Sequence, residues 1–248
     1  MQINISAQNT IHLCEGDTAE NFAVPANNGS TYNWTIQGPP SIANIVSGNG
    51  TENIVIDLNN TGVFWLHVLE IDANFCIGKD SILVEVHPKP NPNISAVGPI
   101  NFCQGDSVLL QVDSLYSSFL WNNNENSSYI YADITDDYFV SVTDINGCSN
   151  TSNSISVVSY ANPIAGFIVE GLCLDYPTFF IDQSIIPLGQ TTSNIWYLGN
   201  GDVFYGDSVT YTYNQIGNYE VGLSIQNEFG CKDSLIQIVE VNSNPEAD

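Results

Sequence analysis

Apolar and polar residues alternate with a period of two along most of this chain. Such alternation turns one face of a strand toward a core and the other toward water. Clusters of Gly, Asn and Pro separate the alternating runs, and these residues favour turns between strands. No run has apolar residues at helical spacing. The pattern therefore predicts an all-β protein.

The alternating runs recur three times in the same order. Each copy has a cysteine that opens a strand, a tryptophan 18 to 23 residues later, two alternating strands, a second cysteine in a turn, and a closing strand. This repetition predicts three tandem β-sandwich domains, although 248 residues alone would suggest one or two domains. The three strands after each tryptophan are expected at residues 53–58, 62–68 and 81–86, then 128–134, 136–142 and 154–158, then 208–213, 217–223 and 234–241.

Proline and asparagine mark the expected domain boundaries. The segments 87–95 and 160–166 are rich in these residues, which favour extended connectors over strands or helices. We therefore expect domains at residues 1–87, 88–160 and 161–248, each large enough for a seven-stranded sandwich.

The six cysteines fall as two per copy at matching positions. Repetition favours one disulfide within each copy, although six free thiols in a reducing compartment are the alternative. A zinc site is less favoured, because no CxxC pair is present and His12, His67 and His87 are not spaced as ligands. Paired cysteines predict an oxidising compartment and hence secretion. The expected pairs are Cys14–Cys76, Cys103–Cys148 and Cys173–Cys231.

The charge balance limits the classes of partner that this chain can bind. With 3 Lys+Arg against 27 Asp+Glu, the formal net charge is −24. Nucleic acid is therefore excluded as an ordinary partner, because too few cations are present to neutralise phosphates, and anionic membrane surfaces are disfavoured for the same reason. No apolar stretch is long enough for direct membrane insertion. Residues 1–4 lack the basic start of a signal peptide, so we expect the signal and the anchor to lie outside this chain.

Catalytic motifs are missing from the sequence. It contains no G-x-S-x-G, no H-E-x-x-H and no phosphate-binding glycine loop. A nucleophile triad would need a histidine held by an acid, and the three histidines are dispersed along the chain. We therefore expect no enzyme activity.

The aromatic residues divide into core and surface candidates. One tryptophan per copy is expected to fill the core of its sandwich. Trp65 and Phe139 have the opposite strand parity and are expected to point outward. Each would then form an interdomain contact, an exposed site for a glycan or protein partner, or packing under a loop, and Trp65 is the first candidate for a ligand contact. The expected core aromatics are Trp34, Trp121 and Trp196, with Phe64, Tyr138 and Tyr219.

Two groups of acidic and amide residues are candidates for Ca²⁺. They are Asp133 with Asp136 and Asp137, and Asn200 with Asp202. Ca²⁺ needs six to eight oxygen ligands, and no segment has the spacing of an EF-hand loop. A solvated acidic rim is the favoured interpretation, so no cofactor is expected beyond this calcium alternative.

The third copy resembles a PKD domain. Residues 196–202 (WYLGNGD) and 211–223 (YTYNQIGNYEVGL) follow the family pattern W-x-F-G-D-G and Y-x-x-x-G-x-Y-x-V-x-L. Leu198 and Asn200 depart from it, which weakens any inference of a polar or metal role for that loop. The first two copies are similar to PKD-like and Ig-like repeats of large Bacteroidota surface proteins, including gliding-motility adhesins and type IX secretion cargo. Residues 138–148 (YFVSVTDINGC) are typical of that group.

A recurring Asp-Ser/Thr-aliphatic motif resembles the O-glycosylation acceptor of secreted Bacteroidota proteins. The alternative is a polar turn that precedes an apolar strand. The candidate acceptors are Thr18, Ser81, Ser107, Ser114, Ser208 and Ser234.

The resemblance implies an extracellular or cell-surface location. It also implies a non-catalytic spacer or adhesion module of a large secreted or surface-anchored bacterial protein. The expected partners are neighbouring repeats of the same polypeptide, with a surface glycan or protein as a further partner. The alternatives are a polymer-binding accessory region of a secreted hydrolase and a docking subunit of a secretion or motility machine.

Overall fold

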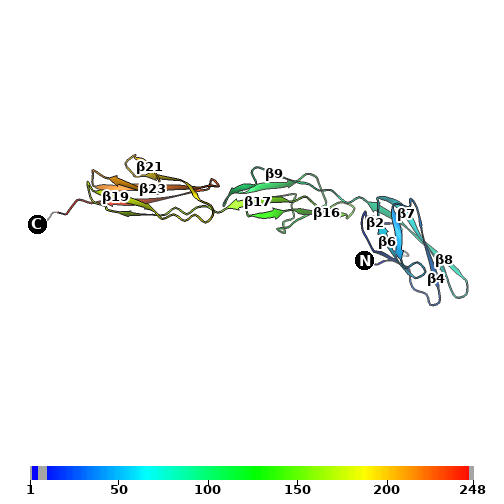
Figure 1. The fold of residues 1–248 in the computed structure, drawn as a ribbon. Coiled ribbons are helices and arrows are strands. Elements are labelled where there is room, and N and C mark those ends of the chain that lie inside the picture. Colours follow the sequence, from blue (N-terminus) through cyan, green and yellow to red (C-terminus); the bar gives the residue numbers. More distant parts are fainter. Residues whose placement is uncertain (1, 5–9, 246–248) are drawn as a thin grey trace. The chain divides into compact units, whose positions relative to one another are not determined.

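The computed structural model describes residues 2–4 and 10–245, and within them every regular element is a β-strand (Figure 1). The described residues contain no helix that is long and apolar enough to cross a membrane. The chain forms two compact units. The first contains Met1–Ser95, Gln111–Ile130 and Tyr138–Ile155, and the second contains Ala96–Leu110, Tyr131–Asp137 and Ser156–Asp248.

The first strands build a sandwich within the first unit. One sheet has the order β1-β3-β6-β5 and the other has the order β2-β8-β7-β4. The strands are β1 (Gln2–Asn4), β2 (Thr10–Cys14), β3 (Glu20–Ala23), β4 (Thr31–Gln37), β5 (Ala43–Ser47), β6 (Asn53–Leu58), β7 (Gly62–Ile71) and β8 (Ile77–His87).

Alternation along the strands builds the core between these two sheets. On β8, Ile82, Val84 and Val86 are buried, whereas Leu83 and Glu85 between them face outward. The expected strands 53–58, 62–68 and 81–86 are thereby confirmed as β6 and as parts of β7 and β8. The core contains Phe22, Tyr32, Trp34, Ile42, Ala43, Ile54, Ile56, Leu58, Phe64, Leu66, Val68, Ile82, Val84 and Val86.

The middle strands are divided between the two units. In the first unit, β15 pairs antiparallel with both β12 and β16. In the second unit, β10 pairs parallel with β17. The middle strands are β9 (Ile94–Val97), β10 (Asn101–Cys103), β11 (Val108–Val112), β12 (Ser118–Trp121), β13 (Tyr129–Ala132), β14 (Asp136–Tyr138), β15 (Val140–Thr143), β16 (Ser149–Thr151) and β17 (Ile155–Tyr160).

The last strands build a sandwich within the second unit. Its sheets have the orders β18-β19-β22 and β21-β20-β23-β24. The long hairpin of β23 and β24 carries the alternating runs expected at 217–223 and 234–241. The strands are β18 (Phe167–Glu170), β19 (Pro177–Asp182), β20 (Thr191–Tyr197), β21 (Val203–Tyr205), β22 (Ser208–Thr212), β23 (Gly217–Asn227) and β24 (Lys232–Val241).

The three tryptophans expected in the core are buried, which confirms the prediction. Trp34, Trp121 and Trp196 are each at most 1 % exposed. Each indole N–H donates to a backbone carbonyl at 2.9 Å, so the one polar atom of each ring is satisfied. The carbonyl acceptors belong to Thr51, Ser127 and Gly206 respectively.

The expected disulfide pairing within each copy is wrong. The structure contains the disulfides Cys14–Cys148 and Cys103–Cys231, each of which joins cysteines of successive copies. Cys76 and Cys173 are free and exposed.

The strand arrangement explains why Cys14 cannot reach Cys76. The parallel pairing of β2 with β8 sets Cys14 beside His87, the last residue of β8. Cys76 comes directly before the first residue of β8, which is 11 residues long. At about 3.3 Å per residue the two cysteines lie roughly 36 Å apart, whereas a disulfide needs Cα atoms within about 7 Å.

The third copy has the same geometry. Cys173 forms a parallel bridge with Asn242, just after β24 ends, whereas Cys231 comes directly before the first residue of β24. The opening cysteine and the turn cysteine of one copy therefore lie at opposite ends of its closing strand. A disulfide from an opening cysteine must reach another copy.

Candidate functional site

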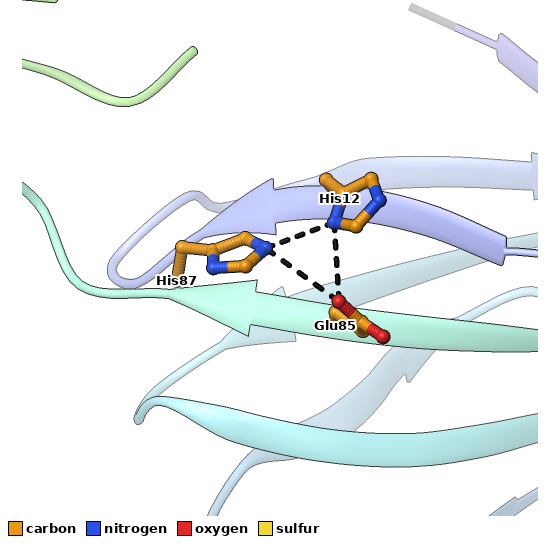
Figure 2. A group of neighbouring side chains, drawn as sticks. All are labelled: His12, Glu85 and His87. Carbon is orange, nitrogen blue, oxygen red and sulfur yellow. Dashed lines mark hydrogen bonds and ion pairs between the residues drawn. The ribbon is translucent and has the colours of Figure 1, made fainter. Parts of the chain in front are cut away.

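Two histidines and a glutamate meet on the outward face of the sheet β2-β8-β7-β4. His12 on β2 lies beside Glu85 on β8 in the parallel register, and His87 follows Glu85 on the same side of β8. His12 Nδ1 is 2.9 Å from His87 Nε2 and 3.3 Å from Glu85 Oε2. His87 Nε2 is 3.9 Å from the same carboxylate oxygen (Figure 2). Three potential ligand atoms therefore converge on one point.

This triad is the one group of three or more His, Cys, Asp or Glu side chains with converging ligand atoms in the described part of the chain. The spacing of His12 and His87 in the sequence did not indicate this grouping. Their separation in sequence is large, but the parallel pairing of β2 with the closing strand β8 brings them together. The sequence signal was the alternation of Glu85 and His87 on the closing strand, with His12 two residues before a cysteine.

Trp65 and His67 follow on the same outward face. Trp65 on β7 pairs with Leu83, is 42 % exposed and stacks on His67 with an interplanar angle of 10°. His67 Nε2 lies 2.9 Å from Gln37 Oε1, which fixes the ring. The structure therefore places Trp65 on the surface, as strand parity predicted, and the ring stacks against the His67 ring.

A polar groove of about 500 Å³ begins beside His67. Its walls belong to β4, β7 and β8, so it lies on the same sheet as Trp65. An exposed aromatic pair beside hydroxyl, amide and charged groups is suited to holding a polar ligand with an apolar face. The lining residues are Asn33, Thr35, His67, Val68, Leu69, Lys79, Asp80 and Ser81.

Phe139 lies between β14 and β15 and is 39 % exposed. Its backbone N–H donates to Asn122 Oδ1 at 3.2 Å, and its carbonyl accepts from Asn122 N–H at 3.1 Å. The backbone is therefore fixed by a neighbouring turn while the ring stays accessible. A partner contact at Phe139 remains a prediction.

The residues proposed for Ca²⁺ are largely occupied by hydrogen bonds within the protein. Asp137 accepts from the hydroxyl of Ser156, and Asp136 Oδ1 accepts from Asp137 N–H at 2.8 Å. Among the described residues, Asp133, Asp136 and Asp137 do not form a three-ligand group of the kind found at His12.

Asn200 and Asp202 form a closed network with a tyrosine. The Tyr211 hydroxyl donates to Asp202 Oδ2 at 2.8 Å, and Asn200 Nδ2 donates to the same oxygen at 2.8 Å. The hydrogen bond to Asp202 raises the pKa of Tyr211 above its ordinary value. This network links both ends of the loop to Tyr211 through side-chain hydrogen bonds.

Five of the six candidate glycosylation residues are exposed, and the sixth, Ser81, is half-buried. Ser81 N–H donates a hydrogen bond within its own motif, to Asp80 Oδ1 at 2.7 Å. Such an Asp-Ser contact is expected both for a polar turn and for a glycosylation acceptor, so it does not distinguish the two interpretations. The exposed residues are Thr18, Ser107, Ser114, Ser208 and Ser234.

Comparison with known proteins defines the class of these repeats. The family model of the PKD-like domain matches residues 1–82, and that of the PKD domain matches residues 176–239. Residues 1–82 are thus similar to PKD-like domains and residues 176–239 to PKD domains, and both segments lie in an all-β arrangement of tandem sandwiches. Such domains are generally non-catalytic modules, and together with the two disulfides they indicate an extracellular protein.

Solved structures with a similar fold include bacterial and animal proteins. The PKD1 domain of Vibrio anguillarum Epp is 22 % identical to this chain, and the alignment covers 34 % of this chain and 96 % of the Epp domain, with a TM-score of 0.32. The PKD1 domain of the Vibrio cholerae metalloprotease PrtV is 26 % identical over 33 % of this chain and 98 % of that chain, with a TM-score of 0.31. Extracellular domains 3–5 of Drosophila OTK are 10 % identical over 96 % of this chain and 95 % of that chain, with a TM-score of 0.37. No curated protein matches the chain.

Proposed function

We propose that this chain is a non-catalytic extracellular repeat segment that acts as a spacer and adhesion module of a large secreted or surface-anchored bacterial protein. The observation that carries the proposal is the disulfide arrangement, in which Cys14–Cys148 and Cys103–Cys231 each tie one copy to the next. Neighbouring repeats of the same polypeptide are thus its first partners.

The disulfides limit how far the chain can be extended by force. The covalent path runs along residues 1–14, crosses to Cys148, returns to Cys103, crosses to Cys231 and continues to residue 248. Fewer than a third of the residues lie on this path, so most of the chain bears no load even if its sandwiches unfold. A covalent limit on extension suits a spacer that must hold another element at a distance.

Force spectroscopy between the two termini tests this role. The oxidised chain is expected to reach less than a third of the extension of the reduced chain, because the backbone gains about 3.3–3.6 Å per freed residue. Cys14→Ser is expected to release an intermediate length, and Cys76→Ser, which removes a free thiol, is the matched control with no change. Equal extension before and after reduction would contradict the spacer mechanism.

The proposal assigns no catalytic role. Its support is the general non-catalytic character of PKD and Ig-like domains and the placement of the His12–Glu85–His87 group on a sheet face, because enzyme sites usually lie in deep clefts.

The cellular setting we propose is the surface of a Bacteroidota cell, as a type IX secretion cargo of the gliding-motility adhesin type. Its support is the resemblance of residues 138–148 to that group and the repeated Asp-Ser/Thr motif. Intact mass of the protein from its native host is expected to exceed the sequence mass by glycan units. An unmodified mass would remove the glycosylation part of the proposal.

Direct polymer binding is a second candidate function, favoured by the Trp65–His67 stack beside the polar groove. Sedimentation of the chain with insoluble chitin or cellulose tests it. Retention that is lost in Trp65→Ala and kept in Tyr205→Ala, which removes an exposed aromatic elsewhere, would favour the polymer binder. Absence of retention favours the spacer.

A further inference from the structure

The opening cysteine has the same backbone surroundings in all three copies. The residue after it donates its N–H to the carbonyl at the end of the closing strand, and the cysteine carbonyl accepts the N–H three residues later. Cys14, Cys103 and Cys173 thus occupy equivalent positions. The first bonds are Glu15 to His87 (2.8 Å), Gln104 to Tyr160 (2.7 Å) and Leu174 to Asn242 (2.9 Å), and the second donors are Asp17, Asp106 and Tyr176.

The turn cysteine is equally conserved in geometry among the copies. A side-chain oxygen four residues before it accepts the cysteine N–H, and the same residue donates its own N–H to the cysteine carbonyl. The residue before each cysteine has a positive φ. The pairs are Asp72 with Cys76 (2.8 Å), Asp144 with Cys148 (2.9 Å) and Asn227 with Cys231 (3.0 Å), measured from Oδ1 to the cysteine N.

The copies differ in what covers these cysteines. Cys148 and Cys231 are paired and are 0 % and 1 % exposed. Cys76 has the same turn but is exposed, and its neighbours Phe75 and Ile77 are 86 % and 64 % exposed. Apolar surface of this kind around an equivalent, preformed turn indicates a contact that another repeat would cover.

We propose that Cys76 and Cys173 are the two open halves of the same inter-repeat disulfide. Cys173 forms a disulfide with the turn cysteine of another repeat of this type, as Cys14 does with Cys148 and Cys103 does with Cys231. Cys76 forms a disulfide with the opening cysteine of another such repeat. A second copy of this chain carries both partners, so the contact is head-to-tail and can continue into an open chain. This inference concerns the junctions between repeats and holds for a spacer or a polymer binder.

The reaction is thiol–disulfide exchange with a disulfide oxidant such as oxidised glutathione. The Cys173 thiolate attacks one glutathione sulfur, which forms a mixed disulfide and releases one glutathione thiolate. The Cys76 thiolate of a second copy then attacks Cys173 Sγ and releases the second glutathione thiolate. The two thiol protons pass to the released thiolates, so two protein thiols are oxidised and one disulfide is reduced.

Two full-length variants test the proposal. Cys76→Ser keeps Cys173 and Cys173→Ser keeps Cys76, and they are mixed in equal amounts after reduction and reoxidised in glutathione buffer. A protein concentration of about 1 mM matches the effective concentration that a short linker gives to neighbouring repeats. Salt at about 0.15 M shortens the range of repulsion between the acidic chains to about 8 Å. The double variant is the control without either thiol.

The expected product is a heterodimer joined by Cys76 and Cys173, in about tenfold excess over each homodimer because only unlike cysteines fit one another. Intact mass and sequencing of the linked peptides identify it, and the double variant stays monomeric. Homodimers in the proportion that random pairing of the two variants gives would contradict the proposal. So would monomers that carry only glutathione under conditions in which Cys14–Cys148 has re-formed.

A second inference rests independently on His12, Glu85 and His87. The three separations of 2.9, 3.3 and 3.9 Å bracket the ligand–ligand distance of about 3.3 Å in a tetrahedral zinc site. Two imidazole nitrogens and one carboxylate oxygen suit Zn²⁺, Ni²⁺ or Cu²⁺ better than Ca²⁺. We infer that this group binds a divalent transition-metal ion, with solvent or a partner ligand in the fourth position.

Calorimetric titration of the full chain with ZnCl₂ tests this site. The background is Cys76→Ser with Cys173→Ser, which removes the two free thiols as competing ligands. One Zn²⁺ per chain is expected, with at least about tenfold weaker binding in His12→Ala and in His87→Ala. His67→Ala is the matched control with unchanged binding, because His67 lies outside the group. Equal binding in all three variants, or no binding in the parent chain, would contradict the inference.

Discussion

At the scale of single residues, strand alternation determines side-chain direction well. It correctly predicted the outward direction of Trp65, whereas the burial of Trp34, Trp121 and Trp196 was predicted from their repeated position, one per copy. Alternation does not determine which strands are neighbours, so it could not bring His12 to Glu85 across the β2–β8 pair. The core could therefore be predicted from the sequence, whereas the histidine group needed the strand order.

A buried tyrosine gives the third copy a dependence on alkaline pH. Burial raises the pKa of Tyr213, and its hydroxyl donates to the Leu198 carbonyl at 2.9 Å. Above about pH 10 the unfolded chain loses this phenolic proton while the folded chain keeps it, so stability falls as pH rises. Urea unfolding midpoints are expected to decrease above this pH.

Tyr213→Phe is expected to flatten that decrease. At neutral pH it also costs about 1–3 kcal/mol, because a buried carbonyl loses its donor. Tyr197→Phe, which changes a half-exposed ring on β20, is the control and should keep the alkaline decrease. An unchanged alkaline slope in Tyr213→Phe would contradict this account.

At the scale of elements, the turns were predictable and the strand pairing was not. The sequence indicates the strands of each copy and the turns that carry the second cysteines. The parallel pairing of β2 with β8 leaves no local sequence signal, and this pairing separates Cys14 from Cys76. The wrong disulfide prediction therefore follows from pairing the two cysteines of each copy without knowing at which end of the closing strand each one lies.

The Asp144 turn is expected to support the disulfide that it carries. Asp144 Oδ1 accepts the N–H groups of Asn146 and Cys148, both at 2.9 Å. Asp144→Ala removes both bonds, and by analogy with capping residues this costs about 1–2 kcal/mol. The Cys14–Cys148 disulfide should therefore reduce at a lower dithiothreitol ratio, measured by mass spectrometry with Cys103–Cys231 as internal reference.

The exposed Asp133→Ala is the matched control for that measurement and should leave both disulfides unchanged. A Cys14–Cys148 disulfide that is equally resistant in Asp144→Ala and in Asp133→Ala would show that the turn does not stabilise it.

At the scale of the whole molecule, the net charge of −24 acts on stability as well as on partners. Carboxylates repel one another in the folded chain, and dissolved salt screens this repulsion. The melting temperature is expected to rise with NaCl, and more steeply between about 0.01 and 0.15 M than above it, because the screening length falls there from about 30 to about 8 Å. A melting temperature that is unchanged or lower at 0.15 M would contradict a dominant role for this repulsion.

The central claim is that disulfides run from one repeat to the next, and peptide mapping without reduction tests it most directly. The oxidised chain is blocked with an alkylating reagent, digested, and sequenced by mass spectrometry. The account predicts linked peptides for Cys14–Cys148 and Cys103–Cys231, with Cys76 and Cys173 alkylated or joined to each other between chains. Linked peptides for Cys14–Cys76, Cys103–Cys148 or Cys173–Cys231 would contradict it.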